Sequence, residues 1–249
     1  MGLLLFSSVA GCAHQQRREN IDPASLDNAV EAIEHFSENP PGALPHHWEP
    51  MVIFRNKKQT DYQLVTEYGK TILHARAASA SSGLMQQVNI DSVTQPWLSW
   101  RWKIGEQADA ADVAAHETED SPARIILGFD GDKDSLPFVD QVMFETARMV
   151  TGHDFPYATL MYVWDSKAPL GTVLSSGRSE RIKKMVVANG PEEIGQWCNF
   201  SRNIVEDFQK AFGEKPGHLI GVGVLTDTEM VGDIAEAWYG DIRLQVARK

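Results

Sequence analysis

Three aspartates in one short loop form the most compact group of possible metal ligands in the sequence. Asp130, Asp132 and Asp134 occupy alternate positions. With this one-three-five spacing a tight loop can wrap carboxylate oxygens around Ca²⁺, a hard cation that prefers several oxygen ligands. Ser135 stands where an EF-hand loop has glycine, and Gln141 stands where it has glutamate, so the loop is not an EF-hand. We therefore expect either a structural Ca²⁺ site or an acidic, solvated turn.

Two further carboxylates, Asp120 and Asp227, are the candidates for catalysis. Asp120 ends a long acidic loop, and Arg124 follows four residues later. A carboxyl group beside a guanidinium can act as a general acid or base, and it can equally form a structural ion pair. Asp227 ends an expected strand in which Gly221 and Gly223 face the same way and leave room for a ligand or another backbone. The alternative for Asp227 is a carboxylate that caps a turn.

Aromatic and charged side chains on several expected strands suit a sugar-binding surface. An aromatic ring can stack on the apolar face of a pyranose while charged groups bind its hydroxyls. Arg101 is the residue that can join the carboxylates of Asp120 and Asp227. The ligand-binding candidates are Arg101, Arg124, Tyr162, Trp164, Tyr239 and Asp241. The aromatic members of this set serve equally well as ordinary core residues.

The strand that must position Arg101 is expected over residues 97–104. Its side chains alternate in character, which is the period of a strand with two different faces. Leu98, Trp100, Trp102 and Ile104 share one face, and Trp97, Ser99, Arg101 and Lys103 share the other. Burial of each large apolar side chain stabilises a fold by about 1.5–3 kcal/mol. We therefore expect this strand in the middle of a sheet, with its basic face toward a groove or solvent.

The rest of the chain predicts a mainly β fold. Strands are expected over 51–55, 62–68, 70–77, 83–88, 123–130, 158–164, 181–187, 218–227 and 236–246, and helices over 137–150 and 203–212. The strands are short and are separated by turn residues, which is typical of a sandwich. We predict an antiparallel β-sandwich, similar to a jelly roll, with two or three short helical insertions. Trp100, Trp102 and Trp238 are expected in its core.

The N-terminus resembles a bacterial lipoprotein signal. A short apolar run leads to Val9-Ala-Gly-Cys12, in which Cys12 would be lipidated after cleavage. The pattern departs from such signals in having no Lys or Arg before the apolar run. Ala13 rather than Asp favours the outer membrane, facing the periplasm. We expect residues 1–12 to be the signal, 13–45 a tether, short helix and linker, and 46–249 the sandwich.

The charge balance limits the possible partners. The chain has 34 Asp and Glu against 23 Lys and Arg, a net charge of −11. This balance argues against nucleic acid and anionic membrane surfaces, which require clustered basic residues. No apolar run reaches the roughly 18 residues of a membrane-spanning helix, so membrane contact is expected only through the lipid anchor. Neutral sugars, cations and basic proteins remain compatible with the composition.

Segments spread over most of the chain carry a resemblance to a known family. They are 99–103, Asp120 with 123–124, 162–164, 171–173, 195–197, 202–203, 212–213, 226–228 and 237–242. Over about residues 48–244 the chain resembles the domain of unknown function 3047 family, bacterial exported proteins expected to be β-sandwiches. Residues 198–201 and 229–231 depart mildly from the family pattern. The resemblance implies the fold and supplies no activity.

Three functions follow as hypotheses. The first is binding of a glycan or another cell-envelope polymer without turnover. The second is a glycan-cleaving hydrolase or lyase that uses Asp120 or Asp227 with Arg101 and Arg124. The third is a scaffold that docks another envelope protein.

Overall fold

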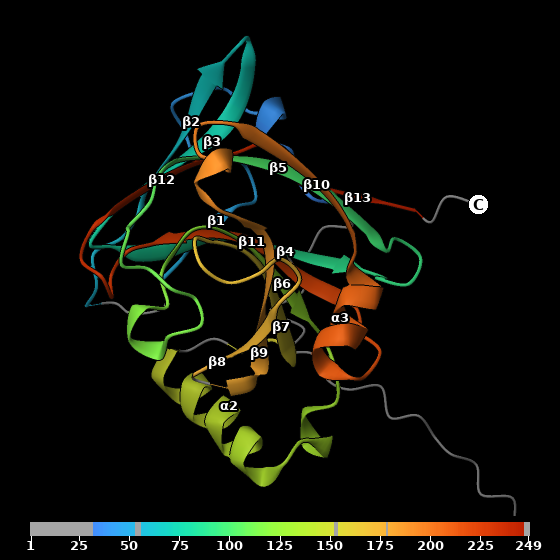
Figure 1. Ribbon diagram of the computed structural model, residues 1–249. Coiled ribbons are helices and arrows are strands. Elements are labelled where there is room, and N and C mark those ends of the chain that lie inside the picture. The colour runs from blue at the N-terminus through green and yellow to red at the C-terminus, as the bar shows by residue number, and fades with distance from the viewer. Residues whose placement is uncertain (1–31, 53–55, 152–153, 178, 247–249) are drawn as a thin grey trace, which may run out of the picture.

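The computed structural model describes residues 32–52, 56–151, 154–177 and 179–246, which form two packed sheets with two α-helices (Figure 1). Cys12, the tether and most of the expected first helix lie outside the described residues. The strands are β1 (Glu49–Met51), β2 (Asp61–Glu67), β3 (Lys70–Ala78), β4 (Ser81–Ile90), β5 (Trp97–Glu106), β6 (Ser121–Phe129), β7 (Ala158–Asp165), β8 (Val173–Ser176), β9 (Ser179–Asn189), β10 (Trp197–Asn203), β11 (Leu219–Asp227), β12 (Ile234–Tyr239) and β13 (Arg243–Gln245). The helices are η1 (Phe36–Glu38), η2 (His116–Thr118), η3 (Lys133–Ser135), α2 (Phe138–Thr151), η4 (Pro191–Glu193) and α3 (Ile204–Phe212).

The predicted β-sandwich is confirmed. One sheet has the strand order β1-β4-β11-β6-β7-β9-β8, and the other has the order β10-β5-β12-β3-β2, with β13 beside β5. All pairings between these strands are antiparallel except β7 with β9, which is parallel. In Figure 1 the six-stranded sheet lies at the top, and α2 and α3 lie on the side of the seven-stranded sheet. Neither α-helix therefore covers the outer face of the six-stranded sheet.

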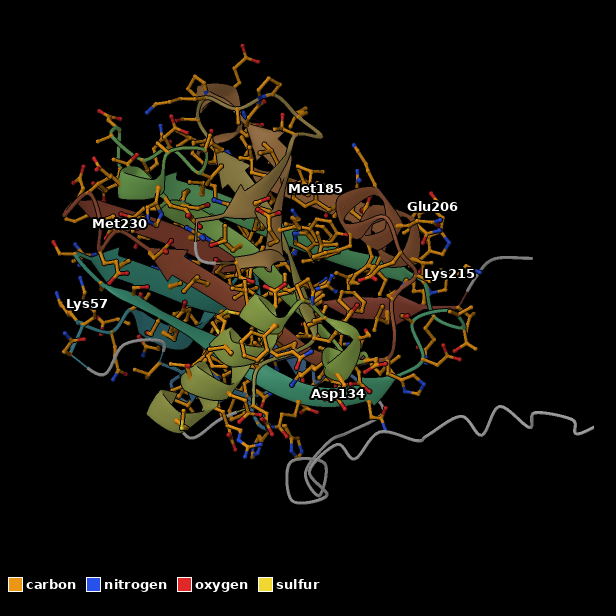
Figure 2. All side chains as sticks on the ribbon, turned by 90° about the horizontal axis from the view of Figure 1, so that it is seen from below. Lys57, Asp134, Met185, Glu206, Lys215 and Met230 are labelled. Atoms are coloured by element: carbon orange, nitrogen blue, oxygen red, sulfur yellow. The ribbon has the colours of Figure 1, made fainter. Side chains whose placement is uncertain are left out.

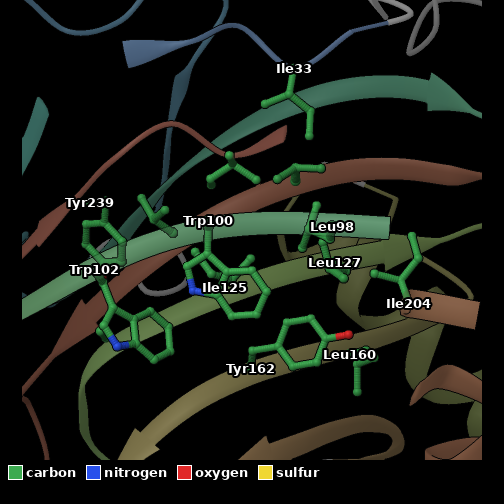
Figure 3. Close-up of a cluster of buried hydrophobic side chains, with 14 of the residues drawn as sticks. Ile33, Leu98, Trp100, Trp102, Ile125, Leu127, Leu160, Tyr162, Ile204 and Tyr239 are labelled. Atoms are coloured by element: carbon green, nitrogen blue, oxygen red, sulfur yellow. The ribbon is translucent and has the colours of Figure 1, made fainter. Parts of the chain in front are cut away.

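The expected Trp-rich strand is β5, and its apolar face fills the space between the sheets. Leu98, Trp100, Trp102 and Ile104 are buried in the main core. The ring of Trp100 stacks on Tyr162 of the opposite sheet (Figure 3). The two ring centroids are 5.0 Å apart. It also stacks on Phe200 of β10 at 4.9 Å. Aromatic contacts of this kind add about 0.5–1.5 kcal/mol each to the effect of burial.

The segment before β1 packs on the sandwich. Ile33, Phe36 and Trp48 are buried in the main core. The indole Nε1 of Trp48 donates a hydrogen bond to the backbone oxygen of Glu34, at 3.2 Å. Residues 33–48, expected as the end of a helix and a linker, thus belong to the same hydrophobic core as the strands.

Helix α3 begins and ends as its sequence predicts. The side chain of Asn203 accepts hydrogen bonds from the backbone N–H groups of Val205 and Glu206 and donates one to the Glu206 carboxylate. Gly213 ends the helix with φ 75°, a left-handed conformation that glycine adopts at low cost. Helix α2 leaves Val139 and Val142 exposed, while Phe144 packs against the main core. No helix among the described residues is long and apolar enough to cross a membrane.

Candidate functional site

Aromatic and charged side chains form a row across the outer face of the six-stranded sheet. Lys103 of β5 is the register partner of Trp197 on β10 and of Trp238 on β12. Trp238 is in turn the partner of His74 on β3. Cross-strand partners project from the same face of a sheet. All four side chains are half-buried. We call Trp197, Lys103, Trp238 and His74, together with Arg101, the aromatic platform.

The members of the platform contact one another through their rings and cations. His74 stacks on Trp238 with centroids 4.9 Å apart. The Lys103 ammonium lies 4.3 Å from the Trp238 centroid and 5.4 Å from that of Trp197. The Arg101 guanidinium lies 4.3 Å from the Trp197 centroid. Cation–π contacts of this kind are worth about 0.5–1 kcal/mol at exposed sites and more where water is excluded.

Two carboxylates hold the platform in place. Glu67 of β2 forms an ion pair with Lys103 and accepts a hydrogen bond from Trp197 Nε1 at 2.9 Å. Glu236 Oε1 of β12 lies 2.6 Å from His74 Nε2. Glu67 thus fixes Trp197 directly, and Glu236 fixes His74, which stacks on Trp238. A site with fixed side chains loses less conformational entropy when it binds.

Two glycines let platform side chains approach the backbone. A Cβ atom on Gly105 would lie 2.5 Å from Cζ3 of Trp238, and one on Gly240 would lie 2.6 Å from Cγ and Nε of Arg101. Both separations are shorter than van der Waals contact. Glycine is therefore required at Gly105, within β5, and at Gly240, directly after β12, by the close packing of a ring and a guanidinium against the backbone.

A second group of charged side chains is buried at one end of the seven-stranded sheet. Nη2 of Arg124 on β6 lies 3.0 Å from Oδ1 of Asp227 on β11, which also accepts a hydrogen bond from Ser121 N. Asp120 Oδ2 accepts hydrogen bonds from the backbone of Met230 and Val231, at 2.9 and 2.8 Å. Asp120, Arg124 and Asp227 are only 1%, 3% and 7% exposed. We call these three residues the buried charge cluster.

Burial dominates the electrostatics of this cluster. It raises the pKa of Asp227 to about 6, although Arg124 favours the ionised form. It also raises the pKa of Asp120, against the effect of the two backbone hydrogen bonds. Lys184 of β9 lies nearby, with Nζ 3.0 Å from Glu119 Oε1, and burial lowers its pKa. Lys184 also donates to the backbone oxygen of Val113, and Arg124 donates to that of Glu119. The cluster and Lys184 together therefore hold the loops around residues 113–120 and 230–231, and the carboxylates of the cluster are shielded from solvent.

The structure joins only part of the predicted site. Asp120, Arg124 and Asp227 come together as expected. Arg101 does not join them, because it lies on the outer face of the other sheet. The expectation that Arg101 bridges the two carboxylates is therefore wrong.

A family comparison covers most of the chain. The family described as "Protein of unknown function (DUF3047)" matches residues 46–243. The chain belongs to the DUF3047 family. No curated protein matches its sequence.

Several solved structures share a distant likeness with this DUF3047 protein. The K2 cleaved adhesin domain of Lys-gingipain is 9% identical, with a TM-score of 0.39, over 86% of this chain and 98% of that one. The family 30 carbohydrate-binding module of cellulase Cel9D-Cel44B of Clostridium thermocellum is 11% identical, with a TM-score of 0.36, over 89% and 96%. The Emp47p carbohydrate recognition domain is 11% identical, with a TM-score of 0.39, over 87% and 95%.

Three aromatic ligand candidates of the DUF3047 protein are core residues. Tyr162 and Tyr239 are 0% exposed and Trp164 is 2% exposed. The hydroxyl of Tyr162 donates a hydrogen bond to Asp207 Oδ2 at 2.8 Å, and that of Tyr239 donates one to the backbone oxygen of Leu225. Of the two alternatives, these three residues follow the one that makes them core residues, because they are on the faces of β7 and β12 that point between the sheets.

The remaining candidates lie elsewhere. Asp241 accepts hydrogen bonds from Ser37 and pairs with Arg243 at 2.8 Å, so it links the N-terminal segment to the C-terminal strand. Asp132 caps η3 by accepting from the backbone of Asp134 and Ser135, and Asp130 accepts from Gly131 N.

The aspartate loop lies apart from the buried charge cluster. Figure 2 shows Asp134 at the bottom of the molecule and Met230, whose backbone contacts Asp120, at its left edge. Within the described ranges no three His, Cys, Asp or Glu side chains are arranged to hold a metal ion. The structure therefore gives the expected Ca²⁺ loop no converging set of ligands.

The sequence did not reveal most of the platform. Trp238 was expected in the core but is half-buried on the outer face, while Ala235, Ala237 and Tyr239 point inward. The alternation of small residues with Trp238 along β12 is the signal that could have placed it. His74 and Glu67 carry no local motif, since only the strand pairing brings them to Trp238 and Lys103.

Proposed function

We propose that this protein is a lipid-anchored envelope protein that binds a glycan or another envelope polymer across the aromatic platform, without turning it over. The observation that carries the proposal is the in-register row from Trp197 through Lys103 and Trp238 to His74. A sheet face that places two indoles beside fixed hydrogen-bonding groups suits a ligand with both C–H faces and hydroxyls.

The chemistry of the platform suits sugars. The carboxylates of Glu67 and Glu236 are hydrogen-bond acceptors, and Lys103, His74 and the indole N–H groups are donors. Charge on this face is mostly paired, as with Lys103 and Glu67. Paired charges provide directional hydrogen bonds for hydroxyls without requiring a highly charged ligand.

Binding without cleavage is favoured by the state of the other candidate residues. A catalytic carboxyl group must reach the bond that it cleaves. Asp120 and Asp227 are almost completely buried and bind backbone N–H groups and Arg124. Their elevated pKa values follow from this burial and do not require a substrate. The cluster therefore supports a structural role.

The location forms part of the proposal. Cys12 would carry the lipid anchor, and the described domain begins about twenty residues later. In this arrangement the domain lies in the bacterial cell envelope, at the outer membrane and facing the periplasm. The net charge of −11 agrees with a protein that contacts membrane through its anchor and does not bind nucleic acid.

A binding experiment with platform variants tests the function. The full chain is applied to an array of envelope-derived oligosaccharides, and the best ligand is titrated calorimetrically. Trp197→Ala and Trp238→Ala should each weaken binding by roughly tenfold, because each removes one stacking ring. Phe138→Ala is the matched control, since Phe138 is an aromatic residue that is 78% exposed on α2. Absence of binding to every oligosaccharide would favour the scaffold hypothesis.

A further inference from the structure

Arg101 differs from the other half-buried or buried arginines of the described chain. Arg124, Arg181 and Arg202 each form an ion pair with an Asp or Glu side chain. Arg101 is half-buried, yet within residues 32–52, 56–151, 154–177 and 179–246 its guanidinium has no carboxylate partner. The sequence has 34 acidic residues against 23 basic ones, so an unpaired cation in an ordered position is notable.

The guanidinium of Arg101 is held in place by contacts that do not neutralise it. Its Cζ atom lies 4.3 Å from the Trp197 centroid. Its stem packs over Gly240, where a Cβ atom would lie 2.6 Å from Cγ and Nε. An aromatic ring supports one face of a guanidinium and leaves the N–H groups at its edge available. Arg101 is thus positioned before any ligand binds.

The other cation of the platform is already neutralised. Lys103 pairs with Glu67, which in turn accepts a hydrogen bond from Trp197. Of the two, only Arg101 has charge available for a ligand. Its planar fork of donors matches a carboxylate, which can accept two parallel hydrogen bonds. Two oxygens of a sulfate can accept from the same fork, so a sulfated compound is included in the test to distinguish the two kinds of acidic sugar.

We propose that Arg101 binds a sugar carboxylate, so that the ligand of the aromatic platform is a glycan that contains acidic, uronate-type sugars. This inference rests on the proposed function, because it assigns a ligand class to the same site. Trp197 would then contact the sugar ring next to the carboxylate that Arg101 binds.

The test compares oligosaccharides of equal length that differ in one group. The full chain is titrated with a neutral β-linked oligoglucose, with the corresponding oligoglucuronate and with a sulfated oligoglucose. We expect tighter binding of the oligoglucuronate by about tenfold over the neutral compound. Arg101→Gln should remove this preference, so that the oligoglucuronate binds no more tightly than the neutral compound. Arg101→Lys should retain part of the preference, because it keeps the charge and loses the fork.

Two controls separate the possible failures. Arg148→Gln removes an exposed arginine on α2 and should leave the preference unchanged. Unchanged thermal melting of Arg101→Gln confirms that it folds. Equal binding of the three compounds, an unchanged preference in Arg101→Gln, or preference for the sulfated compound would each overturn the carboxylate assignment. In all three cases a loss of binding in Trp197→Ala would still support the proposed function. If none of the three compounds binds, the inference is wrong, and the envelope-oligosaccharide array decides whether the proposed function survives.

Discussion

Asp227→Asn tests whether the buried charge cluster is shielded from solvent. Asp227 lies on β11, pairs with Arg124 at 3.0 Å, and has a pKa raised to about 6 by burial. Asparagine has nearly the same shape as aspartate and keeps an oxygen that can accept the hydrogen bond from Ser121 N. Its side chain does not titrate. The difference in stability between the wild type and this variant therefore isolates the proton bound by Asp227.

The sign and size of the effect follow from proton linkage. The folded protein binds this proton more tightly than the unfolded chain, in which the reference value is 3.8. Protonation thus stabilises the folded state at low pH, and this contribution is lost as the pH rises through about 6. Two pKa units correspond to about 3 kcal/mol, of which about 2 kcal/mol is realised between pH 7.5 and pH 4.5.

Urea unfolding at pH 4.5 and at pH 7.5 measures the effect. The stability of the wild type minus that of Asp227→Asn should be greater at pH 4.5 by about 2 kcal/mol. Thr226→Val is the matched control, because Thr226 is a buried neighbour that hydrogen-bonds to Tyr239 and does not titrate. Its stability difference from wild type should be the same at both pH values. A constant difference for Asp227→Asn would show that its carboxyl group ionises as in the unfolded chain, which would refute the account of the cluster.

Four further predictions concern the core, the platform, the metal loop and the anchor. Trp102→Ala should lower the free energy of unfolding by about 3–5 kcal/mol in urea titrations, because a fully buried ring is removed; a loss under about 1 kcal/mol would contradict its place in the core. Gly105→Ala should displace the Trp238 ring and weaken glycan binding by severalfold in calorimetry, whereas unchanged affinity would exclude that ring from the site. Thermal melting curves of the protein with excess Ca²⁺ and with a chelator should coincide, because the aspartate loop has no converging ligands. A stabilising shift in Ca²⁺ that Asp132→Asn removes would instead support the Ca²⁺ site expected from the sequence. Cys12→Ser should move the protein expressed in bacteria from the membrane to the soluble fraction, and retention in the membrane would argue against the lipid anchor.

The faces of β5 could be predicted from the sequence because only one of them is continuously apolar. Trp100 and Trp102 alternate with Arg101 and Lys103, so a single assignment of faces satisfies both burial and charge. The alternation on β7 is less informative, since both of its faces are covered. Tyr162 lies in the main core, while Val163 packs in a separate apolar cluster on the other face.

The composition of the site depends on pairing between distant strands, which a local pattern does not contain. Trp238 faces outward because it alternates along β12 with Ala237 and Tyr239, which point into the core beside Ile104 and Trp102 of the neighbouring strand β5. The sequence correctly predicts that Arg101 and Asp227 each lie in a strand. Their assignment to different sheets follows only from the strand order. The sequence therefore identified the residues of the buried charge cluster and missed most of the aromatic platform.

Calorimetric titration of the best-binding envelope oligosaccharide into the wild type, Trp197→Ala and Trp238→Ala tests the central claim most directly. Binding across the aromatic platform predicts that each substitution weakens the affinity by roughly tenfold, while Phe138→Ala leaves it unchanged. Equal affinities for all four proteins would place the ligand elsewhere and contradict the assignment of this face as the binding site.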